Sequence, residues 1–189
     1  MFDDIVVSSD GAEILDVARR NGVTAVDRPA RLAVDDSPTA ATVSHIISTC
    51  GFDATDVLVL LQPTSPMRTA AHVCDALNAY RKAGQPLVSM DESPQYPDKF
   101  LTLDAEGSLA AVRPGASTLP RQALCAAFKP NGALYIFSVQ EFLAVGDVPI
   151  IGGVPYMMDK LASIDIDDES DLRLATLILE NPHVFYRRS

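Results

Sequence analysis

Two aspartates separated by a single residue give the sequence its clearest candidate for metal chemistry. They lie in the string Ile164-Asp165-Ile166-Asp167. In an extended strand, residues i and i+2 point to the same face, so both carboxylates would share one side while the isoleucines pack on the other. Two carboxylates on one face repel each other unless a cation lies between them, and Mg²⁺ with its waters suits such a pair. We therefore predict a magnesium site at Asp165 and Asp167.

A helix that begins nearby offers a second explanation for part of this acidic string. Negative side chains are favoured at a helix N-terminus. This explanation accounts well for Asp168 and Asp171 but poorly for Asp165. We therefore favour the metal site.

A polar loop fixed by two prolines follows the apolar run 57–61, within the strand expected at 56–61. Its string is Leu61-Gln62-Pro63-Thr64-Ser65-Pro66-Met67-Arg68. Ligands of open α/β sheets bind at the carboxyl ends of the strands, where this loop would lie. Four side chains, those of Gln62, Thr64, Ser65 and Arg68, then offer donors to a base, a sugar or a phosphate. The alternative is a rigid connection between a strand and a helix, with its hydroxyl groups capping that helix.

Basic side chains gather in one segment of an otherwise acidic chain. Lys99, Arg113 and Arg121 all lie between residues 91 and 130. A carboxylate substrate would need such a group, and arginine grips a carboxylate with two parallel hydrogen bonds. The alternative for each is a solvated surface charge. After this segment, Asn131-Gly132 is a turn signal, and Tyr135 follows it in an alternating strand as a core or site residue.

Composition limits the class of protein. The chain has 189 residues, of which 48% are hydrophobic, and its formal net charge is −10. No apolar run reaches the ~20 residues of a membrane helix, and the N-terminus lacks the features of a secretory signal. Three cysteines do not make a disulfide framework, and the acidic charge argues against nucleic-acid binding. We expect a cytoplasmic globular domain that binds neither nucleic acid nor membrane.

The elements that must position these residues form an α/β domain with a mainly parallel sheet. Strands at 5–8, 24–26, 56–61 and 87–90 alternate with helical patterns, which is typical of parallel strands joined by crossover helices. The segment 91–130 breaks this rhythm and reads as an arm or lid inserted into a single domain, 1–189. Two further strands are expected at 133–137 and 163–166. A final helix follows, with Leu172, Ala175 and Leu179 facing inward.

Three polar residues are expected to cap helices. Asp10 with Glu13 fits a capping box, although Asp10 at the end of the first strand is also a candidate ligand-binding carboxylate. Thr69 and Asp168 precede the helical patterns that begin near residues 70 and 169. Each of the three therefore predicts a helix start.

Five strings, read in order, resemble those of the acylneuraminate cytidylyltransferases, the enzymes that make CMP-sialic acid. The resemblance covers nearly the whole chain. The related CMP-Kdo synthetases usually carry a different, acidic string after the strand at 56–61, so the branch acting on sialic-acid-like and legionaminic-acid-like sugars fits better. The strings are Val6-Val7-Ser8-Ser9-Asp10, Arg28-Pro29, Leu61-Gln62-Pro63-Thr64-Ser65-Pro66-Met67-Arg68, Pro130-Asn131-Gly132-Ala133-Leu134-Tyr135-Ile136 and Ser163-Ile164-Asp165-Ile166-Asp167.

This resemblance implies a fold, a reaction and a partner. The fold is the three-layer α/β/α arrangement of nucleotide-diphospho-sugar transferases, a Rossmann-like fold. The reaction transfers CMP from CTP to a nonulosonic 2-keto sugar acid and releases pyrophosphate, with Mg²⁺ neutralising charge on the phosphates. The segment 91–130 resembles the arm through which such enzymes form homodimers and reach into the partner's site.

The resemblance also implies roles for individual side chains. By position, Asp165 and Asp167 match metal ligands, and we expect them to carry catalysis together with Arg121. The expected substrate-binding residues fall into three groups: the sugar contacts Gln62, Asn131 and Tyr135; the basic residue Lys99; and three further residues of the matched strings, Asp10, Arg28 and Arg68.

The chain departs from the family pattern in one respect. The family begins with a strand and a loop of the form P-A-R-G-G-S-K, which grips CTP, and here Met1 comes just before the following strand. We therefore expect residues 1–189 alone to turn over CTP poorly. Two alternatives stay open: a non-catalytic subunit that binds a sugar acid or partners a complete synthetase, and a glycosyltransferase whose D-x-D string is Asp165-Ile166-Asp167.

Overall fold

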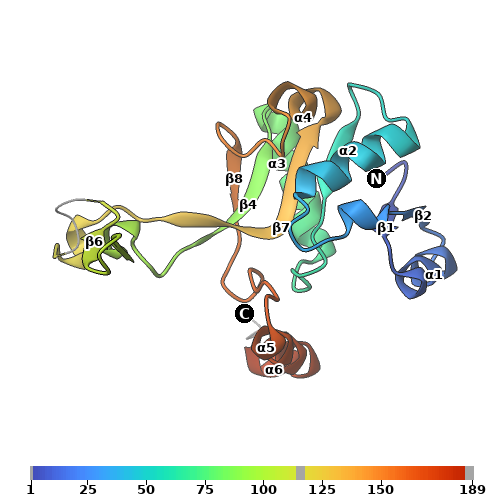
Figure 1. The fold of residues 1–189 in the computed structure, drawn as a ribbon. Helices are drawn as coiled ribbons and strands as arrows, with labels where there is room; N and C mark the ends of the chain where they lie inside the picture. Colours follow the sequence, from blue (N-terminus) through green and yellow to red (C-terminus); the bar gives the residue numbers. More distant parts are fainter. Residues whose placement is uncertain (1, 114–117, 186–189) are drawn as a thin grey trace. The chain divides into compact units, whose positions relative to one another are not determined.

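The computed structural model describes residues 2–113 and 118–185 (Figure 1). By its internal contacts the chain divides into two compact units, which are described separately. The first unit comprises residues 2–58 and 137–151, and the second comprises the described residues of 59–136 and 152–185. None of the helices in these ranges has the length and apolar content that crossing a membrane requires.

The first unit is built on a parallel pair of strands. In this pair β1 (Val6–Ser9) lies beside β2 (Thr24–Asp27). Parallel neighbours need a crossover connection, and helix α1 (Ala12–Arg20) supplies it, contacting both strands and burying Leu15 and Ala18. The unit also contains η1 (Ala30–Leu32), α2 (Thr39–Cys50) and α4 (Val139–Val145).

The predicted capping of helix α1 is wrong. Its N-cap is Gly11, with no side-chain cap, so Asp10 and Glu13 form no capping box. Instead the backbone N–H of Gly11 donates to the hydroxyl of Ser9 at 3.1 Å. A capping side chain must belong to the N-cap residue itself, and Asp10 lies one residue too early.

The second unit holds a mixed sheet in the order β3-β7-β4-β8. Its strands are β3 (Val57–Leu60), β4 (Leu87–Glu92), β7 (Phe128–Ser138) and β8 (Val154–Met157). The first two residues of β3 and the last two residues of β7 belong to the first unit. Strand β4 runs antiparallel to β7 and parallel to β8. The prediction of a strand at 163–166 is wrong, because these residues form no strand. The strand that lies parallel to β4 is β8, which was not predicted.

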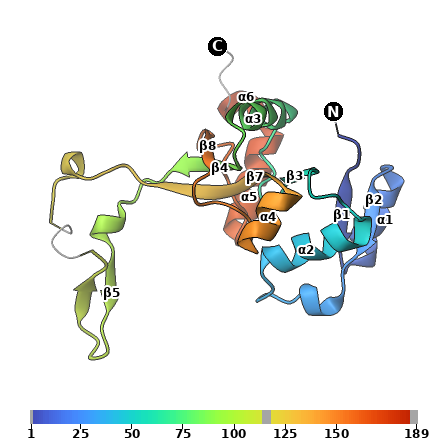
Figure 2. The same ribbon diagram turned by 90° about the horizontal axis from the view of Figure 1, so that it is seen from above.

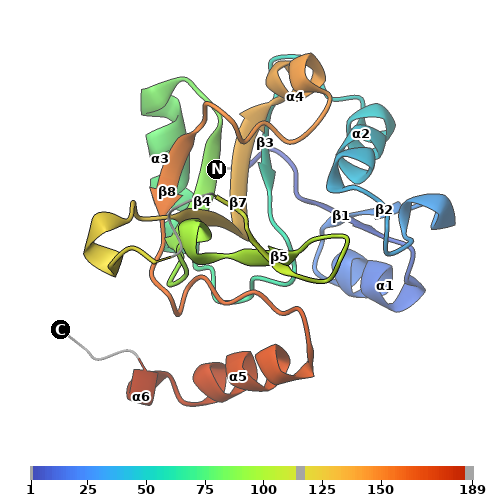
Figure 3. The same cartoon turned by 60° about the vertical axis from the view of Figure 1, so that its left-hand side comes forward.

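The main core of the second unit lies between this sheet and helix α3 (Ala70–Ala83), which contacts β4 and β8 (Figure 3). Thr69 begins this helix with a capping box, as predicted. Burying an aliphatic side chain stabilises a fold by about 1.5–3 kcal/mol, so this core anchors the strands that carry the site. Its buried members are Val73, Ala76, Leu77, Leu87, Ala133, Leu134, Ile136, Met158 and Ala162.

Helix α5 (Glu169–Glu180), followed by α6 (Pro182–Phe185), closes a smaller apolar cluster. Ala175 and Ile178 pack with Met67 of the polar loop, and Ile164 and Ile166 join them. The prediction that Ala175 faces inward is confirmed. For Leu172 and Leu179 it is wrong, since their exposed fractions are 46% and 56%.

An arm occupies most of the predicted excursion, between β4 and β7. It contains η2 (Pro97–Lys99), β5 (Leu101–Leu103), β6 (Leu109–Ala111) and η3 (Arg121–Ala123), and β5 pairs antiparallel with β6. Figures 1 and 2 show it beyond the ends of β4 and β7. Leu101, Leu103 and Leu109 are all more than half exposed.

Candidate active site

Strand β7 carries a wide bulge opposite Ser89 of β4. Val88 pairs with Tyr135, whereas Met90 pairs with Pro130, so residues 131–134 stand opposite a single residue. The Asn131-Gly132 turn signal therefore lies within a strand. Bulges re-aim side chains and occur often beside active sites.

The side chain of Asn131 is buried and fully engaged at the centre of this bulge, with an exposed fraction of 1%. Its Oδ1 accepts from the hydroxyl of Ser89 at 2.5 Å and from the backbone N–H of Ala133 at 3.2 Å. Its Nδ2 donates to the hydroxyl of Ser163 at 2.8 Å. The Asn131 side chain thus joins β4, β7 and the segment that leads to α5.

Gly132 brings the polar loop against the bulge. Its φ of +73° lies in the left-handed region, and a Cβ placed there would lie 2.5 Å from Oε1 of Gln62 and 2.9 Å from the hydroxyl of Ser65. The backbone N–H of Gln62 donates to the Gly132 carbonyl at 3.3 Å, and the Ser65 hydroxyl donates to the Asn131 carbonyl at 2.9 Å. The predicted sugar contacts Gln62 and Asn131 are therefore brought together.

Arg68 lies at the same junction, half-buried. Its Nη1 donates to the backbone carbonyls of Gln62 at 3.1 Å and Ala133 at 2.9 Å. Burial lowers the pKa of this guanidinium from its ordinary value. The structure thus places a predicted substrate-binding arginine on backbone groups of the loop and the bulge.

The segment containing the two aspartates is fastened to the polar loop. The backbone N–H of Ile166 donates to the carbonyl of Thr64 at 2.8 Å, and the flanking isoleucines pack in the small apolar cluster. Although the segment is not a strand, this extended alternation turns the isoleucines inward as predicted. Oδ1 of Asp165 is buried and has no hydrogen-bond partner among the described residues.

Tyr135 lies close to Asp165. Burial and the negative charge of Asp165 raise the pKa of the Tyr135 hydroxyl, and a hydrogen bond from the backbone of Gly132 opposes them. A phenol with a raised pKa is protonated at neutral pH and both donates and accepts hydrogen bonds. Tyr135 and Asp165, both predicted site residues, are therefore near enough to interact electrostatically.

The acidic residues that follow serve mainly the start of α5. Asp168 is the N-cap, as predicted, and its Oδ1 accepts from the backbone N–H groups of Ser170 and Asp171. Hydrogen bonds from the Ser170 side chain and from these backbone groups lower the pKa of Asp168. Oδ2 of Asp171 accepts from the backbone N–H groups of Asp167 and Asp168. The side chain of Asp167 itself is exposed.

The donor set at Asp165 and Asp167 suits a hard cation that keeps most of its waters. Within the described ranges, no group of three or more His, Cys, Asp or Glu side chains could enclose a metal ion. Mg²⁺ is commonly held by one or two carboxylates, with waters and substrate phosphates completing its shell. The buried oxygen of Asp165, unpaired within the described structure, fits such an ion.

Two of the predicted residues lie in the first unit. Nη2 of Arg28 is 3.9 Å from Oδ1 of Asp10, and Nη1 of Arg28 donates to the hydroxyl of Thr42 at 3.5 Å. Asp10 and Arg28 thus form a loose pair at the carboxyl ends of β1 and β2, where ligands of such sheets bind.

The basic residues of the arm have a different setting. Lys99 is exposed at the end of η2, and Arg113 forms an ion pair with Asp98 at 3.3 Å. The backbone of Arg121 begins η3, but its side chain lies outside what the structure describes. Within the part of the chain that the structure describes, Lys99 forms no hydrogen bond or ion pair with Asp165.

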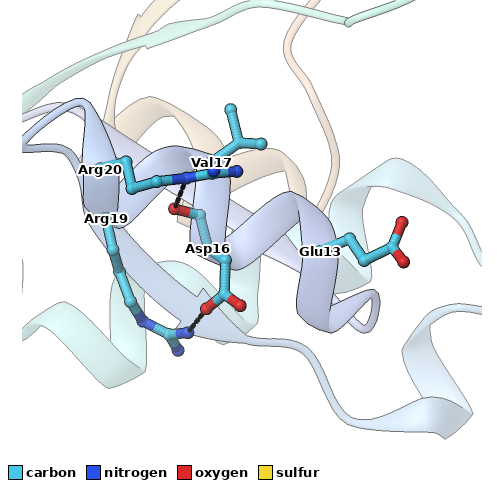
Figure 4. A pocket seen from close by; sticks show the side chains of 5 residues that line it. All are labelled: Glu13, Asp16, Val17, Arg19 and Arg20. Atoms are coloured by element: carbon cyan, nitrogen blue, oxygen red, sulfur yellow. Dashed lines mark hydrogen bonds and ion pairs between the residues drawn. The ribbon is translucent and has the colours of Figure 1, made fainter.

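A shallow hollow on α1 is lined by Glu13, Asp16, Val17, Arg19 and Arg20 (Figure 4). Its charged groups bind one another: Nη1 of Arg19 is 2.8 Å from Oδ1 of Asp16, and Nε of Arg20 donates to the Asp16 carbonyl. None of the predicted site residues lines it, so the candidate site is assigned to the bulge.

Sequence reasoning missed two residues that hold the site together, Ser89 and Ser163. Both are buried, and both bind the Asn131 side chain. Ser89 had a usable signal, because it is the polar residue within the apolar run Leu87-Val88-Ser89-Met90 and a buried hydroxyl needs a partner.

Sequence comparison finds relatives with a consistent set of names. An N-acylneuraminate cytidylyltransferase of Escherichia coli O18:K1:H7 is 29% identical over 180 residues, which is 94% of this chain and 42% of that protein. One from Streptococcus agalactiae serotype V is 29% identical over 174 residues, 90% of this chain and 42% of that protein. A CMP-N,N'-diacetyllegionaminic acid synthase of Legionella pneumophila is 28% identical, covering 94% of this chain and 78% of that protein. No family model matches the sequence.

These relatives confirm the predicted resemblance to the CMP-sialic acid synthetases. The chain spans less than half the length of the first two relatives. The relationship therefore concerns the matched part of those proteins.

Solved structures confirm the predicted fold class. A CMP:2-keto-3-deoxy-manno-octonic acid synthetase in complex with CTP superposes with a TM-score of 0.62 at 11% identity, covering 95% of this chain and 81% of that one. A 4-diphosphocytidyl-2C-methyl-D-erythritol synthase from Anaerococcus prevotii gives 0.63 at 11% identity, covering 95% and 82%. The second unit's mixed sheet and helices thus belong to a Rossmann-like nucleotidyltransferase fold.

The close approach at Gly132 predicts a large effect of one methyl group. Gly132→Ala should lower the free energy of unfolding by more than the ~1–3 kcal/mol that a left-handed non-glycine residue costs, because its Cβ also meets Gln62. The matched control is Gly84→Ala, with a φ of +63° and no atom within 4 Å of the added Cβ. Urea denaturation of both variants measures the difference, and equal losses would contradict the close contact.

The pairing of Tyr135 with Asp165 predicts a shift in titration. Because the negative charge of Asp165 disfavours the tyrosinate, Asp165→Asn should lower the pKa of Tyr135 in metal-free protein. NMR titration of ¹³C-labelled tyrosine follows each ring separately. Asp75→Asn is the control: it should lower the pKa of Tyr156, which Asp75 raises, and leave Tyr135 unchanged. An unchanged Tyr135 in Asp165→Asn would refute the pairing.

Proposed function

We propose that this chain, a relative of the N-acylneuraminate cytidylyltransferases, provides the metal and sugar-acid side of a site that transfers CMP from CTP to a sialic-acid-like 2-keto sugar acid, with release of pyrophosphate. The observation that carries the proposal is the buried, unpaired oxygen of Asp165 beside Tyr135 and the bulge of β7. A buried carboxylate oxygen without a partner is costly, and a bound cation or a ligand donor would offset that cost.

Asp165 and Asp167 are the residues that would hold Mg²⁺. When bound, this ion supplies charge neutralisation on the triphosphate and on the leaving pyrophosphate. Asp165 is held in place by the Ile166 hydrogen bond to Thr64 and by the packing of the neighbouring isoleucines. Asp167 is exposed, so its carboxylate is accessible to an ion that keeps most of its waters.

The sugar acid would lie against the polar loop and the bulge. The Tyr135 hydroxyl, kept protonated by its raised pKa, offers one donor and one acceptor to the sugar. Oε1 of Gln62 lies beside Gly132, so the Gln62 side chain is fixed where the loop faces the bulge. Asp10 and Arg28, which lie in the first unit, are proposed as substrate-binding residues from the family resemblance alone.

The basic residues Lys99 and Arg121 would act across a homodimer. A two-stranded pair is at best marginally stable in water, and the arm leaves most of its large apolar side chains in contact with solvent. A partner subunit that covers the arm would remove this apolar surface from water and bring the arm's cations to an anionic substrate. The large exposed apolar side chains of the arm are Phe100, Leu101, Leu103, Leu109, Val112 and Leu119.

A cytoplasmic location completes the proposal. None of the cysteines in the described structure, Cys50, Cys74 and Cys125, forms a disulfide. The absence of disulfides among them suits a reducing compartment, and the proposed reaction consumes a nucleoside triphosphate.

The metal proposal predicts a ligand-specific loss. Isothermal titration of the chain with Mg²⁺ and N-acetylneuraminate should show Mg²⁺-dependent binding that Asp165→Asn/Asp167→Asn abolishes, while circular dichroism shows an unchanged fold. Glu180→Gln, an exposed acidic residue at the end of α5, is the control and should bind as the wild type does. Binding that persists unchanged in the double variant would reject the assignment.

The dimer proposal predicts a concentration-dependent assembly. Sedimentation at tens of micromolar, a practical working range, should give a homodimer, and Leu101→Lys/Leu109→Lys should shift it to monomer because charges would be buried in the contact. Leu143→Lys, on the exposed face of α4, is the matched control and should leave the dimer intact. A wild-type monomer throughout that range would overturn the arm's role.

A further inference from the structure

We propose that Arg68 is a positioning residue: its guanidinium holds the polar loop against the bulge of β7 and so sets the spacing between Gln62 and Tyr135, without itself contacting substrate. The inference rests on the proposed function for its consequence in binding. That Arg68 holds the loop against the bulge is argued only from contacts within the second unit.

The first argument is the pair of acceptors that Arg68 binds. One Nη1 atom donates to the carbonyl of Gln62, in the loop after β3, and to the carbonyl of Ala133, which lies within the bulge. These acceptors are separated by 71 positions of sequence (133 − 62 = 71). A hydrogen bond from a charged donor is about twice as strong as one between neutral groups, so one cation couples two distant segments.

The second argument is that both acceptors are next to groups of the proposed site. Gln62 carries the side chain that meets Gly132, and Ala133 lies two residues before Tyr135. Two further contacts repeat the connection: the Gln62 N–H donates to the Gly132 carbonyl, and the Ser65 hydroxyl donates to the Asn131 carbonyl. A shift of Arg68 would therefore move a loop and a bulge that have little room to slide past one another.

The third argument concerns the state of the cation. Arg68 is half-buried, and burial disfavours its charge. Backbone carbonyls offset part of this cost through hydrogen bonds, with no carboxylate needed. Both hydrogens of Nη1 are directed at backbone carbonyls, so this end of the guanidinium binds the loop and the bulge and not a ligand.

The test compares three variants by two measurements on the full chain. Arg68→Met removes the donor but keeps an apolar stem, Arg68→Lys keeps a shorter cation, and Arg81→Met makes the same change at an exposed arginine of α3. Hydrogen exchange in the absence of ligand reports on peptides covering 59–68 and 128–137. Titration with N-acetylneuraminate and Mg²⁺ reports on binding.

The expected result is local. In Arg68→Met, amides of the loop and the bulge should exchange about tenfold faster or more, while those of α3 keep their protection, and the affinity for N-acetylneuraminate should fall by a similar factor. Arg68→Lys should lie between Arg68→Met and the wild type, and Arg81→Met should match the wild type. If Arg68→Met does not fold, Arg68→Lys provides the test: amides of its loop and bulge should exchange faster, and it should bind N-acetylneuraminate more weakly, than in the wild type.

Weakened binding with unchanged exchange in the loop and the bulge would mean that Arg68 touches the ligand, and would overturn the proposal. Unchanged exchange with unchanged binding would overturn it as well. If exchange is faster in Arg68→Met but the wild-type chain itself binds no N-acetylneuraminate, the positioning role of Arg68 stands and the proposed function is rejected.

Discussion

The hydrogen bonding of one buried amide organises the candidate site. Asn131 is 1% exposed, and a polar side chain in that position costs free energy unless its donors and acceptors are satisfied. Ser89 and Ser163 satisfy it from β4 and from the segment before α5. Because these partners come from separate parts of the chain, satisfying the amide also fixes where the bulge, the central strand and the aspartate segment lie.

The bulge then determines what surrounds it. Gly132 leaves no space for a side chain, so the polar loop approaches its backbone directly. Arg68 and Ser65 bind carbonyls of the bulge from the loop side, and Ile166 binds the loop from the aspartate side. If the chemistry requires a fixed distance between Tyr135 and Asp165, the backbone contacts of the loop and of the aspartate segment help to maintain that distance.

The acidic residues near the C-terminus divide by environment. Asp168 and Asp171 accept hydrogen bonds from the backbone at the start of α5, where negative charge is also favoured by the helix. Asp165 has a buried oxygen with no such partner in the described structure. The acidic residues between 165 and 171 therefore include structural carboxylates, at Asp168 and Asp171, and a buried carboxylate oxygen suited to a ligand, at Asp165. The arm differs again, because its apolar residues face solvent.

The sequence by itself determined the features that depend on neighbouring residues. Thr69 and Asp168 start helices because a cap binds N–H groups two or three residues away, and the alternation around Asp165 turns both isoleucines inward because an extended chain has a period of two. The strings at 61–68 and 163–167 also carried the family resemblance, since such strings are local. The predicted residues Gln62, Tyr135 and Asp165 are indeed brought together at the bulge.

Tertiary structure alone decided the features that depend on distant partners. Strand β8 was missed and 163–166 was taken for a strand because strand pairing is set by the partner that reaches β4, and a short extended segment does not encode its partner. Leu172 and Leu179 are exposed because the apolar cluster beneath α5 receives only Ala175 and Ile178. Three of the side-chain partners are distant: Ser163 and Ser89 lie 32 and 42 positions from Asn131, and Ala133 lies 65 positions from Arg68. Hydrogen bonds of that span exist only once the chain has folded, so residue type and spacing could name these side chains but not assign their partners.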